Sequence, residues 1–271
     1  MLWIPFRRAF RNVIFRGGVE EFVTNTARWS HGINYLIILS IVLFITWPKE
    51  AFLNLRDPPL PYVATGGIAL VMLAYINISQ GSRKLLGEQY MSLREWLSLA
   101  PLKAATFVRG YVAAGFLECG FFWALSLPLL VLAAGVAGES LAHAVAGSLI
   151  VLICAGTYRI VAVALLLCLE RDEFLLYLLV RVLYGFMIVV SGFVWPVCNP
   201  IWAFANASLW HKDYRLQEQA LPGIEIPGWG VTVGLHLLIA GLFFIIASVR
   251  VRWIRRQAMR LDVASEEAET G

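Results

Sequence analysis

The sequence predicts an all-α integral membrane protein with six transmembrane helices and with both its N and C termini in the cytosol. Of the 271 residues, 59% are hydrophobic and 15% are charged, and the mean hydropathy is +0.72. Soluble domains are nearer half apolar and a quarter charged, so this composition is typical of a chain that lies in a bilayer. Six apolar segments approach the roughly 20 residues that cross a bilayer. We expect them to form one transmembrane domain, residues 1–271.

The N-terminal segment, residues 1–30, is expected to be an interfacial amphipathic helix followed by a connector. Apolar side chains share one face of a helical wheel over the first 16 residues and arginines take the other: Leu2, Trp3, Phe6, Phe10, Val13 and Ile14 against Arg7, Arg8, Arg11 and Arg16. Such a helix lies in the membrane plane, with its aromatic rings at the acyl boundary and its arginines on anionic headgroups. Gly17-Gly18 is expected to end it. A disordered basic tail is the alternative, and it fits the spacing of the aromatics poorly.

The six spans are separated by intervals that disfavour a membrane helix. Pro58-Pro59 and Pro61 exclude a helix between the first two spans, and a charged run, Glu170 to Glu173, separates the fourth from the fifth. Pro128 is expected to kink the third span. The predicted spans are about Ile33–Trp47, Tyr62–Ile78, Tyr111–Val136, Ala144–Leu169, Phe174–Trp195 and Val231–Val249.

The distribution of lysine and arginine predicts the orientation of these spans. Seventeen of the 22 basic residues lie in the N-terminal segment, in the interval between spans two and three, around the charged hairpin, or after span six. The loops on the opposite side hold only Lys49, Arg56, Lys212 and Arg215. Because cytosolic loops carry the excess of lysine and arginine, both termini are expected in the cytosol, with residues 250–271 as a cytosolic tail.

The interval between spans two and three, residues 80–110, combines positive charge with an apolar stripe. It holds five cations, and its middle part repeats apolar residues at helical spacing: Met91, Leu93, Leu97, Leu99 and Leu102. Pro101 stops or bends this helix. A basic amphipathic helix here can lie in the inner headgroup layer or dock on a soluble partner. We adopt the second hypothesis.

The interval between spans five and six, residues 196–228, is predicted to contain an outer re-entrant segment. An apolar stretch of about ten residues follows Pro200, and this is too short to cross a bilayer, which takes about 17 residues or more. Backbone interrupted by Pro196 and Pro200 is tolerated at membrane depth only beside protein or a water-filled cavity. Trp195, Pro196, Pro200 and Trp202 are the candidate outer-gate residues. An ordinary outer loop with aromatic anchors is the alternative.

Three ionisable residues inside the spans are candidate functional groups: Glu118, Arg159 and His236. A charge at the bilayer centre costs about 2.5–3.5 kcal/mol on insertion scales, so each is expected to have a partner or a function. Glu118 and Arg159 lie on consecutive antiparallel spans, and the helical rise puts all three at a similar depth. They form either a static bridge that fixes packing, or a site at which Arg159 attracts an anionic substrate beside a translocation path.

Several motifs are absent from the sequence. It has no phosphate-binding loop of the form GxxxxGK[ST], no HExxH and no GxSxG. The four cysteines make no metal-binding spacing, and the basic residues follow the loops rather than forming a nucleic-acid patch. Repeated halves with matching broken helices, typical of ion-coupled carriers, are also missing. Energy for any transport would come from elsewhere, and no cofactor or metal is expected on this chain.

Three stretches resemble the type 2 ABC exporter permeases. SLREWLSLAPLKAATFVRG resembles the segment between their second and third spans, in which an acidic residue, a leucine-rich helix, a Pro-Leu step and a glycine follow in order. Leu125 to Pro128 resembles the end of their third span, and SGFVWPVCNP, Ser191 to Pro200, resembles the break after their fifth. Trp96 departs from the small residues usual there.

This resemblance implies a transmembrane permease subunit that pairs with a second copy or a paralogue. Each subunit would rest on a separate ABC ATP-binding subunit, which binds ATP and Mg²⁺, through a coupling helix. The matching residues are Arg94, Glu95, Leu97, Leu99 and Pro101. The implied activity is export of an amphiphilic, lipid-linked or hydrophobic substrate across the cytoplasmic (inner) membrane of a bacterial cell, with no role for nucleic acid.

Two other functions remain open at this point. A membrane-embedded lipid-modifying enzyme would need Glu118, Arg159 and His236 to converge on one pocket. A structural membrane anchor for a soluble partner would tolerate exchange of Glu118 and Arg159 without loss of function.

Overall fold

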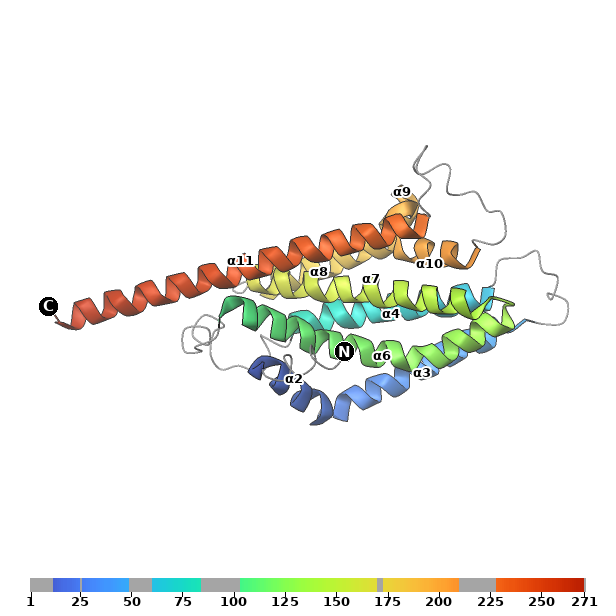
Figure 1. Ribbon diagram of the computed structural model, residues 1–271, viewed down its shortest axis with the longest axis horizontal. Helices are drawn as coiled ribbons and strands as arrows, with labels where there is room; N and C mark the ends of the chain where they lie inside the picture. The colour runs from blue at the N-terminus through green and yellow to red at the C-terminus, as the bar shows by residue number, and fades with distance from the viewer. Residues whose placement is uncertain are drawn as a thin grey trace, which may run out of the picture.

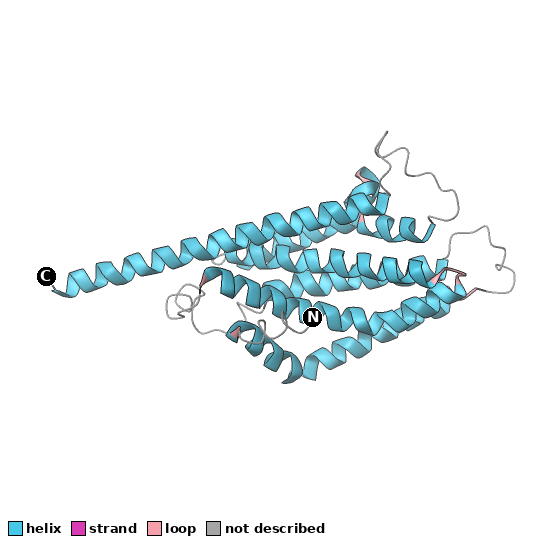
Figure 2. Cartoon of the chain, in the orientation of Figure 1, coloured by secondary structure: helices cyan, strands magenta, loops and turns pink. Residues whose placement is uncertain are grey.

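The computed structural model describes residues 12–48 apart from 25, and residues 60–83, 103–169, 173–209 and 228–270. Every regular element in this part of the chain is a helix (Figure 2). The six predicted spans are confirmed as helical segments long and apolar enough to cross a membrane: Arg28–Ile45, Leu60–Ser79, Ala105–Val136, Leu141–Cys168, Phe174–Val194 and Trp229–Gln257. The chain therefore has the architecture of a multi-pass membrane protein.

The long helices lie side by side in one bundle (Figure 1). They are α3 (Thr26–Ile45), α4 (Leu60–Arg83), α6 (Ala104–Val136), α7 (Leu141–Cys168), α8 (Glu173–Gly185) with its continuation, and α11 (Gly228–Thr270). The end of the bundle at which α3 and α6 begin and α7 ends is called the basic end below. α11 extends past the other helices at this end (Figure 1).

α7 is the central helix of the bundle. It contacts α4, α6, α8, α10 and α11, and 72% of its membrane-length segment is buried, against 22% for the fifth span and 17% for the sixth. Side-chain donors to backbone carbonyls connect neighbouring helices. The Trp123 indole donates to the Ser148 carbonyl, and the Tyr184 hydroxyl donates to the Val71 carbonyl. In hydrocarbon such bonds avoid an unsatisfied polar group, although each is worth only about 0.6 kcal/mol.

Several helices are longer than the hydropathy pattern predicted. α6 begins at Ala104 rather than near Tyr111 and passes through Pro128 without interruption, and α11 continues to Thr270 rather than ending near Val249. Hydropathy locates the apolar part of a helix. The helix itself continues until its backbone hydrogen bonding ends. The predicted spans were therefore correct in number and order, but the first, second, third and sixth were short at the basic end.

The prediction that Gly17-Gly18 ends the first helix is wrong, because α2 runs through it from Val13 to Thr24. A Cβ atom built on Gly18 would lie 2.5 Å from the Cβ of Ala114 on α6. The absence of a side chain at Gly18 thus lets the two helices touch. This close packing compensates for the low helix propensity of the glycine pair.

α2 follows α6 along its length. Asn12 caps the start of α2, since its side-chain oxygen accepts from the Ile14 N–H at 3.0 Å, and its amide donates to the Thr106 carbonyl at 2.7 Å. Ten residues further on, the rings of Phe22 and Phe121 meet edge to face at 5.2 Å. The described part of the N-terminal helix is therefore docked on the bundle. The rest of the predicted interfacial helix, residues 1–11, lies outside the described residues.

A short helix, α10 (Pro200–Leu209), fills the opposite end of the bundle. Its Phe204 ring is fully buried and inserts between two glycines, Gly66 on α4 and Gly147 on α7. The ring packs 4.8 Å from that of Tyr62, whose hydroxyl donates to the His143 carbonyl at 2.9 Å. Gly66 and Gly147 are each about 9 Å along their helices from the outermost residue, so α10 is seated between the helices rather than above them.

The close fit of the Phe204 ring between Gly66 and Gly147 predicts that a single added methyl group will destabilise the protein. In Gly66→Ala the added Cβ would lie 1.9 Å from Phe204, so overpacking should destabilise the protein by about 1–3 kcal/mol. Gly120→Ala is the matched control, because nothing lies within 4 Å of its added Cβ. That variant should be neutral or slightly stabilising. Thermal unfolding in detergent measures both, and Phe204→Leu should partly rescue Gly66→Ala. Equal stability of the two alanine variants would contradict the close packing of Phe204 against Gly66.

Candidate functional site

Four charged side chains from four helices form a continuous ionic chain in the half of the bundle nearer the basic end. The Arg28 Nη2 atom on α3 lies 2.8 Å from Glu21 Oε1 on α2, and its Nε lies 3.3 Å from Glu118 Oε1 on α6. The other oxygen of Glu118, Oε2, lies 3.7 Å from Arg159 Nη1 on α7. Glu118 is therefore a single carboxylate shared by two arginines.

Three members of the ionic chain are buried. The exposed fractions are 4% for Arg28 and 2% each for Glu118 and Arg159, whereas the Glu21 side chain remains partly exposed. Removing charges from water costs several kcal/mol per ion, and this is offset only when partners and hydrogen bonds are in place. Two carboxylates and two guanidinium groups make the ionic chain neutral overall, so its burial leaves no net charge among the helices.

Arg159 is the least satisfied member. Its Nε and Nη1 atoms have no hydrogen-bond partner within the described part of the chain. The side chain passes over Gly115, where an added Cβ would lie 2.3 Å from Nε, and its guanidinium lies 5.9 Å from the centre of the Tyr111 ring. Arg159 is thus held by Glu118 and by an aromatic face, in a space that exists because residue 115 is glycine.

Glu118 lies near the middle of α6, about 21 Å from its start, and Arg159 lies about 14 Å from the end of α7, whereas Arg28 is in the first turn of α3. Glu118 and Arg159 are each about 27 Å, at about 1.5 Å per residue, from the opposite ends of α6 and α7, and Arg28 is about 26 Å from the end of α3. The sequence places Glu118 and Arg159 on facing spans, and the structure brings them together. Their predicted pairing at mid-membrane depth stays a prediction as regards depth, since the helix positions alone do not fix the level of the bilayer.

Arg28 and Glu21 were missed by sequence reasoning, which counted Arg28 only as a topology signal before the first span. A usable signal exists in the spacing of the residues. The buried face of α3 is made by Gly32, Tyr35, Leu39 and Leu43, and the same period extended backward by one turn reaches Arg28. A cation on the buried face of a helix needs an anionic partner.

His236 is held separately from the ionic chain. Its ring Nδ1 lies 2.8 Å from the Thr232 carbonyl, and its own carbonyl accepts from the Thr157 hydroxyl at 3.2 Å. Its ring packs 6.1 Å from that of Tyr158. These contacts place His236 between α11 and α7, whereas Arg159 points to Glu118 on α6. The three intramembrane candidates therefore divide into one pair and one separate histidine.

The five candidate coupling residues, Arg94, Glu95, Leu97, Leu99 and Pro101, lie outside the described residues. The structure describes the two flanks of their interval, α4 up to Arg83 and the chain again from Lys103. Both flanks are at the basic end, so the interval joins two helices that are in contact with each other in the bundle.

The candidate outer-gate residues surround the turn after the fifth span. That span ends as a π-helix, η2 (Phe186–Val190), and one α-helical turn, α9 (Ser191–Val194), followed by the 3₁₀ turn η3 (Pro196–Cys198). Trp195 and Pro196 are exposed on the turn, Pro200 is buried as the first residue of α10, and Trp202 is partly exposed. The prolines therefore separate two helices, as predicted.

The Asn199 side chain holds this turn in place through hydrogen bonds on both sides of it. Sequence reasoning did not identify this residue. Its side-chain oxygen caps α10 by accepting from the N–H groups of Ile201, at 2.8 Å, and Trp202, at 3.1 Å. Its amide donates to the Ile188 carbonyl and to the Ser191 hydroxyl, both at 2.9 Å. The Asn-Pro pair was a readable signal, because asparagine is favoured at N-cap and proline at the next position. The link to the π-helix could be seen only in three dimensions.

Neutralising the shared carboxylate should be the most damaging single change in the ionic chain. Glu118→Gln leaves the buried Arg159 guanidinium without its anion and leaves Arg28 with Glu21 alone, and breaking a buried pair in this way costs about 3–5 kcal/mol. Glu20→Gln removes a carboxylate from an exposed pair with Arg16 and is the matched control, with little expected effect. Thermal unfolding measures both. A Glu118→Gln protein as stable as Glu20→Gln would show that the ionic chain does not hold the helices.

Asn199→Asp should separate the two functions of that side chain. Aspartate keeps the oxygen that caps α10 but loses the donor to the Ile188 carbonyl, so a buried acceptor is left unpaired at a cost of about 1–3 kcal/mol. Asn206→Asp, on the same helix and only partly buried, is the control. Proteolysis at the turn and thermal unfolding report the change. Equal behaviour of the two variants would show that the link to the π-helix is dispensable.

Comparison with models of known protein families and with curated proteins finds no match to this chain.

Proposed function

We propose that the chain is the membrane-spanning permease subunit of an ATP-driven ABC exporter, which moves an amphiphilic, lipid-linked or hydrophobic substrate outward. The observation that carries this proposal is the position of Glu118. It lies on α6, the helix that directly continues the 80–110 interval, and it holds Arg28 on α3 and Arg159 on α7. A movement applied to that interval would therefore reach three spans through one carboxylate.

The length and continuity of α6 suit such a transmission. The helix is unbroken from Ala104 to Val136, and Glu118 lies about 21 Å from its start. α2 is tied to the same part of α6 by Asn12 and Gly18, so the N-terminal arm would move with it. In this proposal the amphipathic coupling helix docks on the ATP-binding subunit. Leu97 and Leu99 fill an apolar groove there, while Arg94 and Glu95 make ion pairs at its rim.

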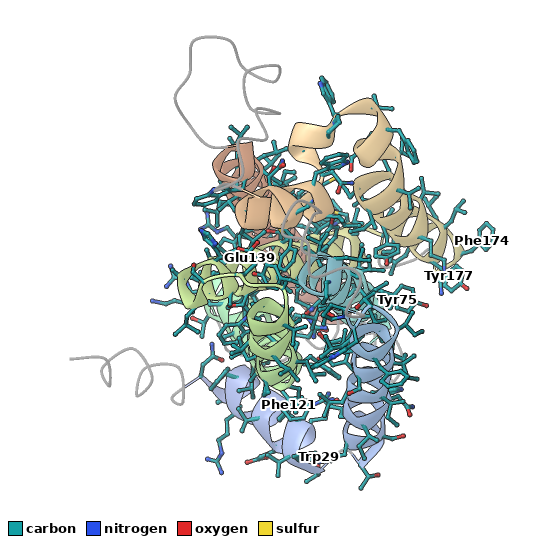
Figure 3. All side chains as sticks on the ribbon, turned by 90° about the vertical axis from the view of Figure 1, so that its right-hand side faces the viewer. Trp29, Tyr75, Phe121, Glu139, Phe174 and Tyr177 are labelled. Atoms are coloured by element: carbon teal, nitrogen blue, oxygen red, sulfur yellow. The ribbon has the colours of Figure 1, made fainter. Side chains whose placement is uncertain are left out.

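The face formed by α3, α4 and α8 is the proposed substrate path. α4 contacts both of the other helices, and Tyr75 on α4 remains partly exposed between them, with its ring 5.6 Å from that of Tyr184 (Figure 3). Phe174 and Tyr177 on α8 point away from the bundle beside this face (Figure 3). Such an aromatic, apolar surface suits an amphiphile, and a second copy or a paralogue would enclose it.

The remaining parts of the proposal follow from this arrangement. The basic end faces the cytosol with both termini, in the cytoplasmic membrane of a bacterial cell. α10 acts as the re-entrant segment, and the turn carrying Trp195, Pro196, Pro200 and Trp202 acts as the outer gate. This chain binds no cofactor itself, and ATP with Mg²⁺ is bound by the partner subunit.

The coupling segment provides the decisive test. Glu95→Arg and Leu97→Asp should each abolish co-purification with the ATP-binding subunit encoded in a neighbouring reading frame, or uncouple its ATP turnover, because a charge is reversed or buried at the docking surface. Glu20→Arg makes the same reversal at an exposed site on α2 and should leave the complex intact. Normal coupling in both test variants would reject the docking role. Activity without ATP that depends on His236 would favour a lipid-modifying enzyme instead.

A further inference from the structure

The outward face of α11 changes from apolar to cationic within one helical turn. Four exposed apolar residues follow one another at spacings of four and three, and two exposed arginines continue the same series: Leu238, Leu242, Ile245 and Val249, then Arg252 and Arg256. The opposite face is fixed by packing, since Ala247, Val251 and Ile254 are buried against α6 and α7. The two arginines therefore lie on the face that is turned away from the bundle.

The other arginines near this point have contacts within the protein. Arg250 donates from Nε to the Leu167 carbonyl at 3.1 Å and lies 4.2 Å over the Trp253 ring. It thereby satisfies one of the carbonyls left open at the end of α7. Arg255 also has a partner. From Arg250 to Leu261 the sequence holds five arginines and no carboxylate, so nothing in this stretch neutralises Arg252 and Arg256.

The level of these arginines is set by Arg250. Its bond to Leu167 places it beside the last turn of α7, which ends at Cys168. Arg252 and Arg256 therefore lie at and just beyond the end of the bundle. Trp253 is partly exposed at the same level, and tryptophan is typical of the boundary between hydrocarbon and headgroups. An apolar stripe that ends at Val249, followed by Arg252, Trp253 and Arg256, describes a passage from acyl chains to headgroups.

We propose that Arg252 and Arg256 bind the phosphate of an anionic phospholipid whose acyl chains lie along Val249, Ile245 and Leu242. Residues four apart on a helix are neighbours, and two guanidinium groups can hold one phosphate through paired N–H···O bonds. A soluble acidic protein would satisfy the charges but would leave the continuous apolar stripe unused. This site belongs to the membrane body of the protein and does not depend on the proposed exporter function.

The test measures lipid binding to the purified full-length protein in detergent. Phosphatidylglycerol, phosphatidylcholine and inorganic phosphate are each titrated, and retained lipid is counted by native mass spectrometry alongside the shift in unfolding temperature. We expect phosphatidylglycerol to bind and stabilise the protein, and phosphatidylcholine and inorganic phosphate to do so much more weakly. Equal binding of both lipids, or equal protection by inorganic phosphate, would overturn the proposal.

Two double variants locate the site with the same loss of charge. Arg252→Gln with Arg256→Gln should weaken phosphatidylglycerol binding about 30-fold, from about five-fold for each basic residue at an anionic surface. Arg250→Gln with Arg255→Gln should lower the unfolding temperature while most of the lipid preference remains. Arg252→Lys with Arg256→Lys should give an intermediate affinity, because a point charge replaces a paired donor. Equal loss of lipid binding in the two glutamine variants would show that the lipid responds to the overall positive charge and not to a site formed by Arg252 and Arg256.

Discussion

The arrangement of four helices in the bundle depends on one carboxylate. Glu118 lies between two guanidinium groups that come from different helices, and a third helix joins through Glu21. Apolar packing alone leaves helices free to slide or rotate by a fraction of a turn, whereas a buried charge must remain within reach of its partner. The relative positions of α2, α3, α6 and α7 are therefore set by charge, and apolar contacts fill the space that remains.

Small residues make this arrangement possible at both ends of the bundle. Without a side chain at Gly18, α2 reaches α6, and without one at Gly115 the Arg159 side chain has room to reach Glu118. At the other end, Gly66 and Gly147 receive the Phe204 ring. Small residues at membrane helix interfaces commonly let backbones approach. In this protein the glycines also make room for two large side chains: Arg159 passes over Gly115, and Phe204 inserts between Gly66 and Gly147. Each of these side chains fixes the position of its own helix relative to its neighbours.

The sequence was a good guide to the features that repeat along a helix and a poor guide to those that join distant residues. The lengths of the apolar segments located all six spans, and insertion cost singled out Glu118, Arg159 and His236. Gly17-Gly18 misled because propensity describes an isolated helix, whereas tertiary contact with Ala114 decides this one. Arg28 was assigned to the N-terminal segment ahead of the first span because hydropathy does not register one cation on a buried face. The divergence of His236 from Arg159 depends on the rotation of α7, which no spacing specifies.

The ionic chain also imposes an order on biosynthesis. Arg28 leaves the ribosome with the first span, its partner Glu118 follows only with the third, and Arg159 comes with the fourth. Until then, Glu21 is the one member of the ionic chain that can pair with Arg28, and the guanidinium is expected to stay among lipid headgroups or water, because entering hydrocarbon without Glu118 is costly. The N-terminal arm can settle against the bundle only when the third span arrives. The first helix made is thus among the last to reach its final position.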